Sequence, residues 1–138
     1  LDVASQLSRM KEVCSQLDDS NIRVSLFIDA DKKQIDAAMV CGAPVIEIHT
    51  GHYTDAVSSV ERELKYNEIK QACKYAHSLG LQVNAGHGLT LDNTMAIAKI
   101  DSIVELNIGH SIISRAVFVG LANATTEMKT LMLEARGL

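Results

Sequence analysis

The sequence predicts an α/β fold with a parallel sheet. Four short apolar segments typical of β-strands alternate with amphipathic segments of helical length along the 138 residues. Parallel strands need long crossover connections, which helices usually supply, so this alternation favours a parallel sheet. Each apolar segment ends in a polar, mostly titratable residue: Asp29, His49, His87 and His110. Because parallel strands bring their carboxyl ends to one edge, these residues are expected to share a rim like that of an active site.

Composition indicates one globular domain and excludes several classes of function. Apolar residues make up 47 % of the chain and aromatic residues only 4 %, so the core is expected to be aliphatic. The 13 Lys and Arg residues are scattered over a chain of net charge −4, which leaves no basic stripe for nucleic acid. No apolar run could cross a bilayer and no signal peptide is visible, so we expect no membrane partner. Three separate cysteines without a CxxC motif argue against a zinc site and predict buried thiols in a reducing cytoplasm: Cys14, Cys41 and Cys73.

The first half of the chain predicts two helices and two strands. An apolar stripe with steps of three and four residues predicts the first helix: Val3, Leu7, Met10, Cys14 and Leu17. A strand over 23–28 follows, and acidic residues 29–31 can cap a helix over 32–40 that ends at Gly42. The second strand covers 45–49, and residues 50–54 are expected to form a loop.

The second half repeats the pattern. A helical region reaches residue 79, and its expected apolar stripe has a phase break that fits a kink or two helices: Val57, Val60, Leu64, Ile69, Ala72, Cys73 and Ala76. A strand over 82–85, a helix over 92–98 and a strand over 103–108 follow. One last helix is expected to end at Gly137 and to carry another stripe: Val117, Leu121, Ala124, Met128, Leu131, Met132 and Ala135.

Two parallel folds fit this order. The length favours an open, doubly wound sheet, since a (β/α)8 barrel needs eight strands and about 250 residues. However, no GxGxxG loop follows the first strand, and polar residues lie within the strands: Glu47, Asn84, Glu105 and Asn107. An open sheet buries both faces and tolerates such residues poorly, whereas in a barrel they can line the pocket at the mouth.

The strand ends carry the candidate chemistry. Glu47 is flanked by apolar residues, and a buried carboxylate is costly without a partner or a function. His87 lies between two glycines, which leave its imidazole uncovered for proton exchange near neutral pH; a solvated turn histidine is the alternative. Gly88, Gly109 and His110 are candidates for phosphate binding, because barrels often bind phosphate at the last two strand ends and at a short helix, here over 109–116.

The other histidines carry weaker signals. His49 and His52 form an HxxH motif in the expected loop. No cysteine or cluster of carboxylates lies beside them along the sequence, so no metal site is predicted. His49 is expected only as a wall of the pocket, Asp29 receives no role, and His77 is expected at a partly exposed helix end.

Three motifs resemble those of a known family: VIEIHTGHY at the second strand, VNAGHGLT at the third and ELNIGHSIISRAV at the fourth. With the opening LDVA and the closing EMKTLMLEARG, they cover almost the whole chain and resemble the PdxJ family of pyridoxine 5′-phosphate synthases. The resemblance implies a (β/α)8 (TIM) barrel that assembles as a homo-octamer. It also implies a ring-closing transferase of vitamin B6 biosynthesis. Such an enzyme joins 1-deoxy-D-xylulose 5-phosphate to 3-amino-2-oxopropyl phosphate, giving pyridoxine 5′-phosphate, phosphate and water.

The resemblance implies a role for each matching residue. His87 is the proton donor and acceptor, and Glu47 stabilises charge in the transition state. Gly88, Gly109 and His110 hold a substrate phosphate. Neither a metal nor an organic cofactor is implied. The partners are phosphorylated small molecules and further copies of the chain, in the cytoplasm.

Residues 1–138 are expected to form the C-terminal half of this barrel, with four βα units in one domain. The chain begins at Leu1, within a helical pattern. The family's first four strands have no counterpart here. This chain therefore lacks the residues that those strands carry in the family: a second catalytic histidine, a general-base glutamate, and the arginines and asparagine that bind the substrate. Four strands cannot close an eight-stranded ring, so a piece of a longer enzyme is favoured over a half that pairs with another half.

Two other functions are compatible with the strand ends. One is a different phosphate-binding barrel enzyme, an isomerase or an aldolase. A Schiff-base aldolase would need a lysine on a strand, and none of the four strands has one, which argues against it. A non-catalytic half-barrel that binds a phosphorylated metabolite, or simply self-associates, would account for the glycine-rich ends and for the missing half together.

Overall fold

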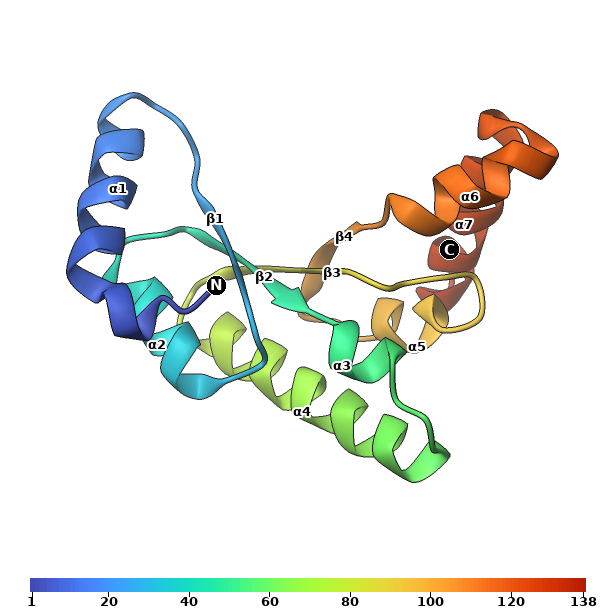
Figure 1. The fold of residues 1–138 in the computed structure, drawn as a ribbon, viewed down its shortest axis with the longest axis horizontal. Helices are drawn as coiled ribbons and strands as arrows, with labels where there is room; N and C mark the ends of the chain where they lie inside the picture. The colour runs from blue at the N-terminus through green and yellow to red at the C-terminus, as the bar shows by residue number, and fades with distance from the viewer.

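The computed structural model describes residues 1–138 and contains one sheet of four parallel strands (Figure 1). The strands are β1 (Ser25–Ile28), β2 (Val45–His49), β3 (Gln82–Gly86) and β4 (Ile103–Asn107), and they lie side by side in the order of the sequence. A doubly wound sheet reverses its strand order at a switch point, and this sheet does not. The chain therefore winds as half of a (β/α)8 barrel does, and the α/β prediction is confirmed.

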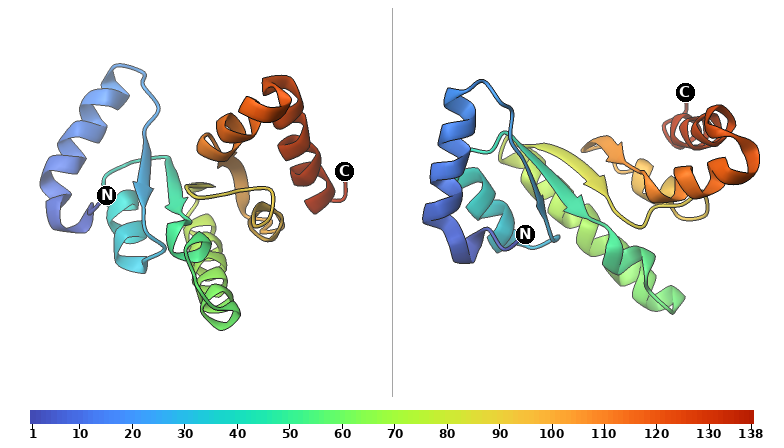
Figure 2. Two further views of the ribbon diagram at one scale, coloured as in Figure 1. Left: turned by 45° about the vertical axis from the view of Figure 1, so that its right-hand side comes forward. Right: turned by 45° about the horizontal axis from the view of Figure 1, so that its top comes forward.

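Helices surround the sheet unevenly (Figures 1 and 2). A 3₁₀ turn (η1, Ala4–Gln6) leads into α1 (Leu7–Asp19), which lies with α2 (Lys32–Val40) near β1. The long α4 (Ser59–Ser78) runs along one face of the sheet, and α3 (Gly51–Thr54) precedes it. Beyond β3 and β4 lie α5 (Thr94–Ala98), α6 (His110–Val119) and α7 (Leu121–Ala135).

The two faces of the sheet differ in polarity. On the helix side, Ile46 and Ile48 of β2 are fully buried, and they pack with the matching residues of the neighbouring strands in an aliphatic core. The other face carries Glu47 of β2, next to Asn84 of β3 in the strand register. Phe27 of β1, on the same face, is 38 % exposed. The polar residues within the strands therefore lie on the side that a closed barrel would turn inward.

Several local predictions are confirmed. Asp31 caps α2 by accepting a hydrogen bond from the backbone N–H of Lys33 at 2.8 Å. All three cysteines are buried and free, in agreement with the predicted role of small core residues. His77 is exposed in the last turn of α4. No helix is both long and apolar enough to pass through a membrane.

Two predictions about the elements are wrong, and one of two alternatives is excluded. Residues 51–54 form the one-turn helix α3, where a loop was expected, because a single turn is too short to show a helical period. The phase break after Leu64 produces no second helix, since α4 is continuous. The single last helix is instead two, α6 and α7, divided at Gly120, where φ is +81°. The strand and helix ends otherwise agree with the predictions to within one or two residues.

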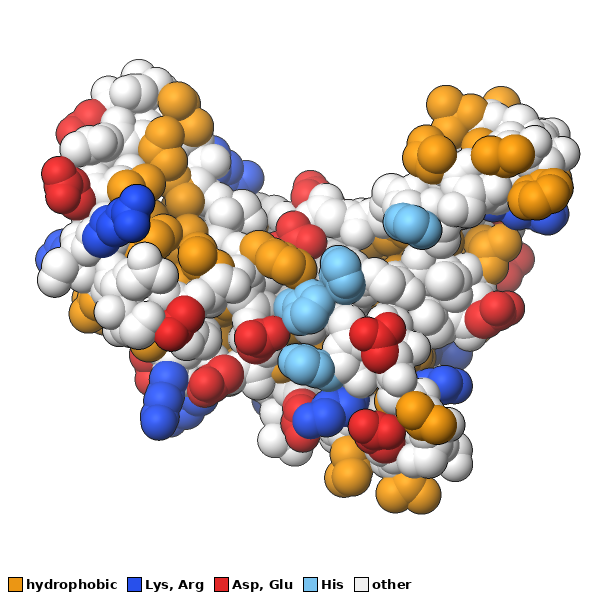
Figure 3. All heavy atoms as spheres, viewed as in Figure 1, with side chains coloured by type: hydrophobic (Ala, Val, Ile, Leu, Met, Phe, Trp, Pro, Cys, Tyr) orange, Lys and Arg blue, Asp and Glu red, His pale blue; other side chains and the backbone are white.

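Part of the predicted apolar stripes does not enter the core. Val57, just before α4, is 95 % exposed and Val60, in its first turn, 71 %, although Ile69 and Cys73 further along α4 are buried. Val117, at 79 % exposed, shows the same discrepancy on α6. Figure 3 shows groups of apolar side chains at the upper right and at the lower end of the molecule, in addition to those along its left-hand part. The sequence period identifies which face of a helix is apolar. It does not show whether another element covers that face, and no element of this chain covers the apolar faces at the start of α4 and on α6.

Candidate active site

All five residues predicted for the site line one pocket of about 430 Å³ at the carboxyl ends of the strands: Glu47, His87, Gly88, Gly109 and His110. Phe27 closes the pocket on the β1 side, and Asn107 and Ser111 contribute from the end of β4 and the start of α6. The structure therefore brings together residues that lie far apart in the sequence. The chemical role of each of the five residues remains a prediction.

Glu47 and Asn107 meet across the strand that separates them. The amide nitrogen Nδ2 of Asn107 donates a hydrogen bond to Oε2 of Glu47 at 2.7 Å, although β3 lies between β2 and β4. The intervening residue is Gly86, paired with His49 on one side and with Asn107 on the other. A Cβ on Gly86 would collide with Oε1 of Glu47 and would lie 2.8 Å from the carbonyl oxygen of Asn107. The missing side chain at Gly86 thus creates the space for this pair.

Burial raises the pKa of the Glu47 carboxyl above its usual value. The nearby carboxylate of Glu105 acts in the same direction, while the hydrogen bond from Asn107 and the imidazoles of His49 and His87 oppose the shift. A half-buried carboxyl held by an amide, beside two imidazoles, is suited to respond to positive charge that develops on a ligand.

His87 has an unusual backbone. Its φ is +83°, and among the non-glycine residues only Asn21 also has a positive φ. The buried hydroxyl of Thr50 lies within hydrogen-bond distance of the carbonyl oxygens of Gly86, at 2.8 Å, and of His87. A strained residue persists only when its surroundings fix it, and such residues concentrate at functional sites. His87 is exposed to the pocket, as its flanking glycines predicted.

The two candidate phosphate-binding glycines differ. Gly88 has a φ of +73°, and a Cβ there would collide with the side chain of Thr54, so the backbone requires glycine. Gly109 has a φ of −116° and open space around it, so its glycine leaves room for a ligand without serving the fold. His110 begins α6, whose first N–H groups have no partner within the helix. Ser111 ties this helix to the β3–α5 loop by donating a hydrogen bond to the carbonyl of Leu89 at 2.6 Å.

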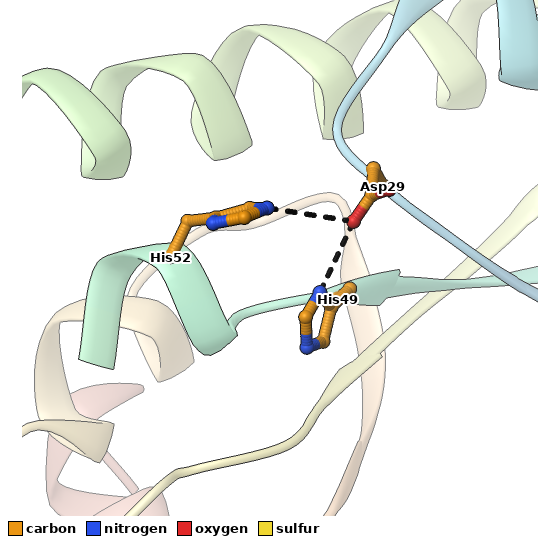
Figure 4. Close-up of side chains that lie close together, drawn as sticks. All are labelled: Asp29, His49 and His52. Atoms are coloured by element: carbon orange, nitrogen blue, oxygen red, sulfur yellow. Dashed lines mark hydrogen bonds and ion pairs between the residues drawn. The ribbon is translucent and has the colours of Figure 1, made fainter. Parts of the chain in front are cut away.

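His49 is not a wall of the pocket, contrary to expectation. Its ring lies behind His87, with 4.8 Å between the two ring centroids, and its edge contacts Phe27. Nδ1 of His49 is 3.1 Å from Oδ1 of Asp29, a residue to which the sequence assigned no role (Figure 4). This pairing was missed because it joins two strand ends 20 residues apart. The only available signal was their shared position at the rim.

The strand order and the pocket define the class of protein: a βα-barrel architecture with its ligand site at the carboxyl ends of the strands. Within that class, this chain belongs to the family described as pyridoxal phosphate biosynthesis protein PdxJ, whose sequence model matches residues 1–134. The resemblance recognised from the strand-end motifs is thereby confirmed.

Two relatives illustrate the match. The pyridoxine 5′-phosphate synthase of Photobacterium profundum is 54 % identical over 136 residues, which cover 99 % of this chain and 56 % of that protein. The protein of the same name from Coxiella burnetii (strain RSA 493 / Nine Mile phase I) is 58 % identical over 136 residues, which cover 99 % of this chain and 57 % of that protein. The chain therefore spans a little over half the length of the curated relatives it matches.

Proposed function

We propose that this chain is the C-terminal half of a pyridoxine 5′-phosphate synthase and supplies one side of its active site. The enzyme would condense 1-deoxy-D-xylulose 5-phosphate with 3-amino-2-oxopropyl phosphate to form pyridoxine 5′-phosphate, phosphate and water. One observation carries the proposal: in a member of the PdxJ family, all five residues expected at the site line a single pocket.

His87 is proposed as the residue that donates and accepts protons. Its imidazole faces the pocket, and the strained backbone is held by Thr50, so the ring is presented to the ligand from a fixed base. A histidine side chain that faces a ligand in this way can act as a general acid and base. Such general acid–base help is typically worth about 10²- to 10⁴-fold in rate.

Glu47 is proposed to stabilise positive charge in the transition state. Asn107 fixes one carboxylate oxygen, and Oε1 points at the space above Gly86. Because partial burial weakens screening by water, a charge developing nearby would interact with this carboxylate more strongly than it would in solution.

The phosphate group of a substrate is proposed to lie between Gly88, Gly109 and His110. The amino end of α6 offers unpaired backbone N–H groups and the positive end of a helix dipole. The side chain of His110 is exposed beside it and lines the same pocket. The open space at Gly109 leaves the backbone accessible to an anion.

The remaining residues of the site are proposed to come from an N-terminal half of the same barrel. In this chain β1 and β4 are edge strands, each paired on one side only. Four more βα units would pair with both edges and close the ring. By the family resemblance we further propose a cytoplasmic homo-octamer.

The test is an assay of the full-length protein that carries this chain, supplied with both phosphorylated substrates. Pyridoxine 5′-phosphate detected by mass spectrometry, together with release of inorganic phosphate, would support the proposal. Binding of the substrates without turnover would favour the non-catalytic reading. A covalent adduct after borohydride treatment with a keto-phosphate would favour a Schiff-base enzyme instead.

A further inference from the structure

A second group of polar side chains lies behind the pocket, at the ends of β1 and β2. Asp29 follows β1, His49 ends β2, and His52 projects from α3 (Figure 4). Oδ1 of Asp29 is 3.1 Å from Nδ1 of His49 and 3.8 Å from Nε2 of His52, and the three ligand atoms all lie within 4.8 Å of one another.

We propose that these three residues bind a divalent transition-metal ion of the zinc class. Two imidazole nitrogens and one carboxylate oxygen form a donor set that suits Zn²⁺ and its neighbours, and they leave at least one coordination position for water. Bonds of about 2.0–2.1 Å in a tetrahedral site place neighbouring ligand atoms about 3.3 Å apart. Oδ1 of Asp29 lies 3.1 Å and 3.8 Å from the two imidazole nitrogens, on either side of this value, and all three ligand atoms lie within 4.8 Å of one another, so rotation of the exposed His52 ring can bring them to binding distance.

The structure positions one of the ligands closely and leaves another adjustable. A Cβ on Gly51 would lie 2.5 Å from Nε2 of His49, so this glycine makes room for the imidazole. That ring also packs edge-on against Phe27. His52 is 69 % exposed, and it meets the ring of His49 with 5.6 Å between the ring centroids and without a hydrogen bond, so its ring can turn onto an ion.

The surrounding charges are compatible with a cation. The shallow pocket beside the cluster is also lined by Asp31, Glu68 and Lys65. Lys65 is the only cationic side chain in that lining, and Glu68 neutralises it through a salt bridge of 2.9 Å. With that pair neutral, Asp29 and Asp31 leave the lining with a net negative charge.

A simpler account gives Asp29 only the task of orienting His49 through their hydrogen bond. That account assigns nothing to His52, whose Nε2 lies beyond hydrogen-bond distance of Asp29. His52 therefore separates the two possibilities. A metal site needs its imidazole, and a hydrogen-bonded pair does not.

The experiment is titration of Zn²⁺ alone into the metal-free full-length protein by calorimetry, with Co²⁺ absorption as a second reading of the coordination. We expect one Zn²⁺ site per chain that depends on all three residues. His52→Ala and Asp29→Asn should each weaken it by at least about 10-fold, the loss that removal of even an outer-shell partner can cause. His77→Ala, which removes an exposed histidine on α4, is the matched control and should leave the affinity unchanged.

Absence of Zn²⁺ binding would overturn the proposal. Affinity that is equal in the wild type and in His52→Ala would also overturn it, because it would place any bound metal elsewhere. Circular dichroism of each variant checks that the fold is retained. Since binding is measured without substrates, the outcome does not depend on the proposed synthase activity.

Discussion

At the residue scale, the site depends on groups held in states that they would not adopt alone. His87 keeps a positive φ that costs about 1–3 kcal/mol for a residue with a side chain, and Thr50 holds it there. Glu47 keeps a carboxyl in partial burial, with Asn107 as its hydrogen-bond partner. The positive φ of His87 and the burial of the Glu47 carboxyl both cost stability, and they lie on adjoining strands of one rim. Their coincidence indicates a functional site.

Replacing Glu47 by Gln tests whether partial burial of the Glu47 carboxylate costs stability. The raised pKa means that the folded state binds this proton more tightly than the unfolded chain does. The carboxyl therefore costs stability at about pH 7, and this cost vanishes as the pH falls below the unfolded pKa of about 4.5. Glu47→Gln should unfold at a higher temperature than the wild type at neutral pH.

The difference between the two melting temperatures should shrink towards about pH 4, where both side chains are neutral for most of the time. Glu134→Gln, at an exposed position on α7, is the control for a change of net charge. A stabilisation of Glu47→Gln that stays constant over this pH range would contradict the assignment of its cause.

The residue scale also shows where the sequence is informative about the site. The five pocket residues could be predicted because each lies within three residues of the carboxyl end of an apolar strand, which parallel topology brings to one edge. The pairs Glu47–Asn107 and Asp29–His49 could not, because they depend on which strands become neighbours and on what lies between them. The absence of a cysteine or a cluster of carboxylates beside the HxxH motif had argued against a metal there, yet the fold brings Asp29 to both histidines.

At the scale of elements, β3 acts as a spacer within the site. Its last residue, Gly86, separates Glu47 from Asn107 and must remain without a side chain. In the full-length protein, Gly86→Ala is expected to cost about 1–3 kcal/mol of stability, the usual range for overpacking, and to break the hydrogen bond between the two flanking side chains. The midpoint of urea unfolding measures the loss.

Gly109→Ala is the matched comparison for stability, since it adds the same methyl group at the same rim into open space. Its free energy of unfolding should differ from that of the wild type by no more than about 0.5 kcal/mol, as expected at an unconstrained surface position. Equal effects of the two substitutions would show that Gly86 has no special place between the strands.

Elements were predictable where the pattern that forms them is local and their partner lies in this chain. Strands β1 to β4 and the buried part of α4 met both conditions. The early turns of α4 and the exposed end of α6 carry apolar faces with nothing in this chain to cover them, so their period predicted a burial that is absent. The break at Gly120 was missed because the apolar stripe continues on both sides of it.

At the scale of the whole molecule, the chain exposes strand edges and apolar side chains that have no partner in this chain. Both edge strands present unpaired backbone groups, and Val104 on β4 is 70 % exposed. Phe118 on α6 is 84 % exposed. Open edges combined with apolar side chains promote association, since another strand can extend the sheet.

The 138-residue chain expressed alone should therefore self-associate, whereas the full-length protein should form one defined oligomer. Light scattering after size-exclusion chromatography, over a range of concentrations, measures both. Val104→Lys should reduce the association of the isolated chain, because an edge lysine hinders pairing of strands. A stable monomer of 15.0 kDa would contradict this prediction.

The central claim is that the rim of this chain supplies the acid–base group of a pyridoxine 5′-phosphate synthase. The most direct measurement is kcat for pyridoxine 5′-phosphate formation by the full-length protein, compared between the wild type, His87→Ala and His77→Ala. We predict a loss of about 10² or more in His87→Ala with the fold retained, and an unchanged rate in His77→Ala. Undiminished turnover in a folded His87→Ala variant would contradict the claim.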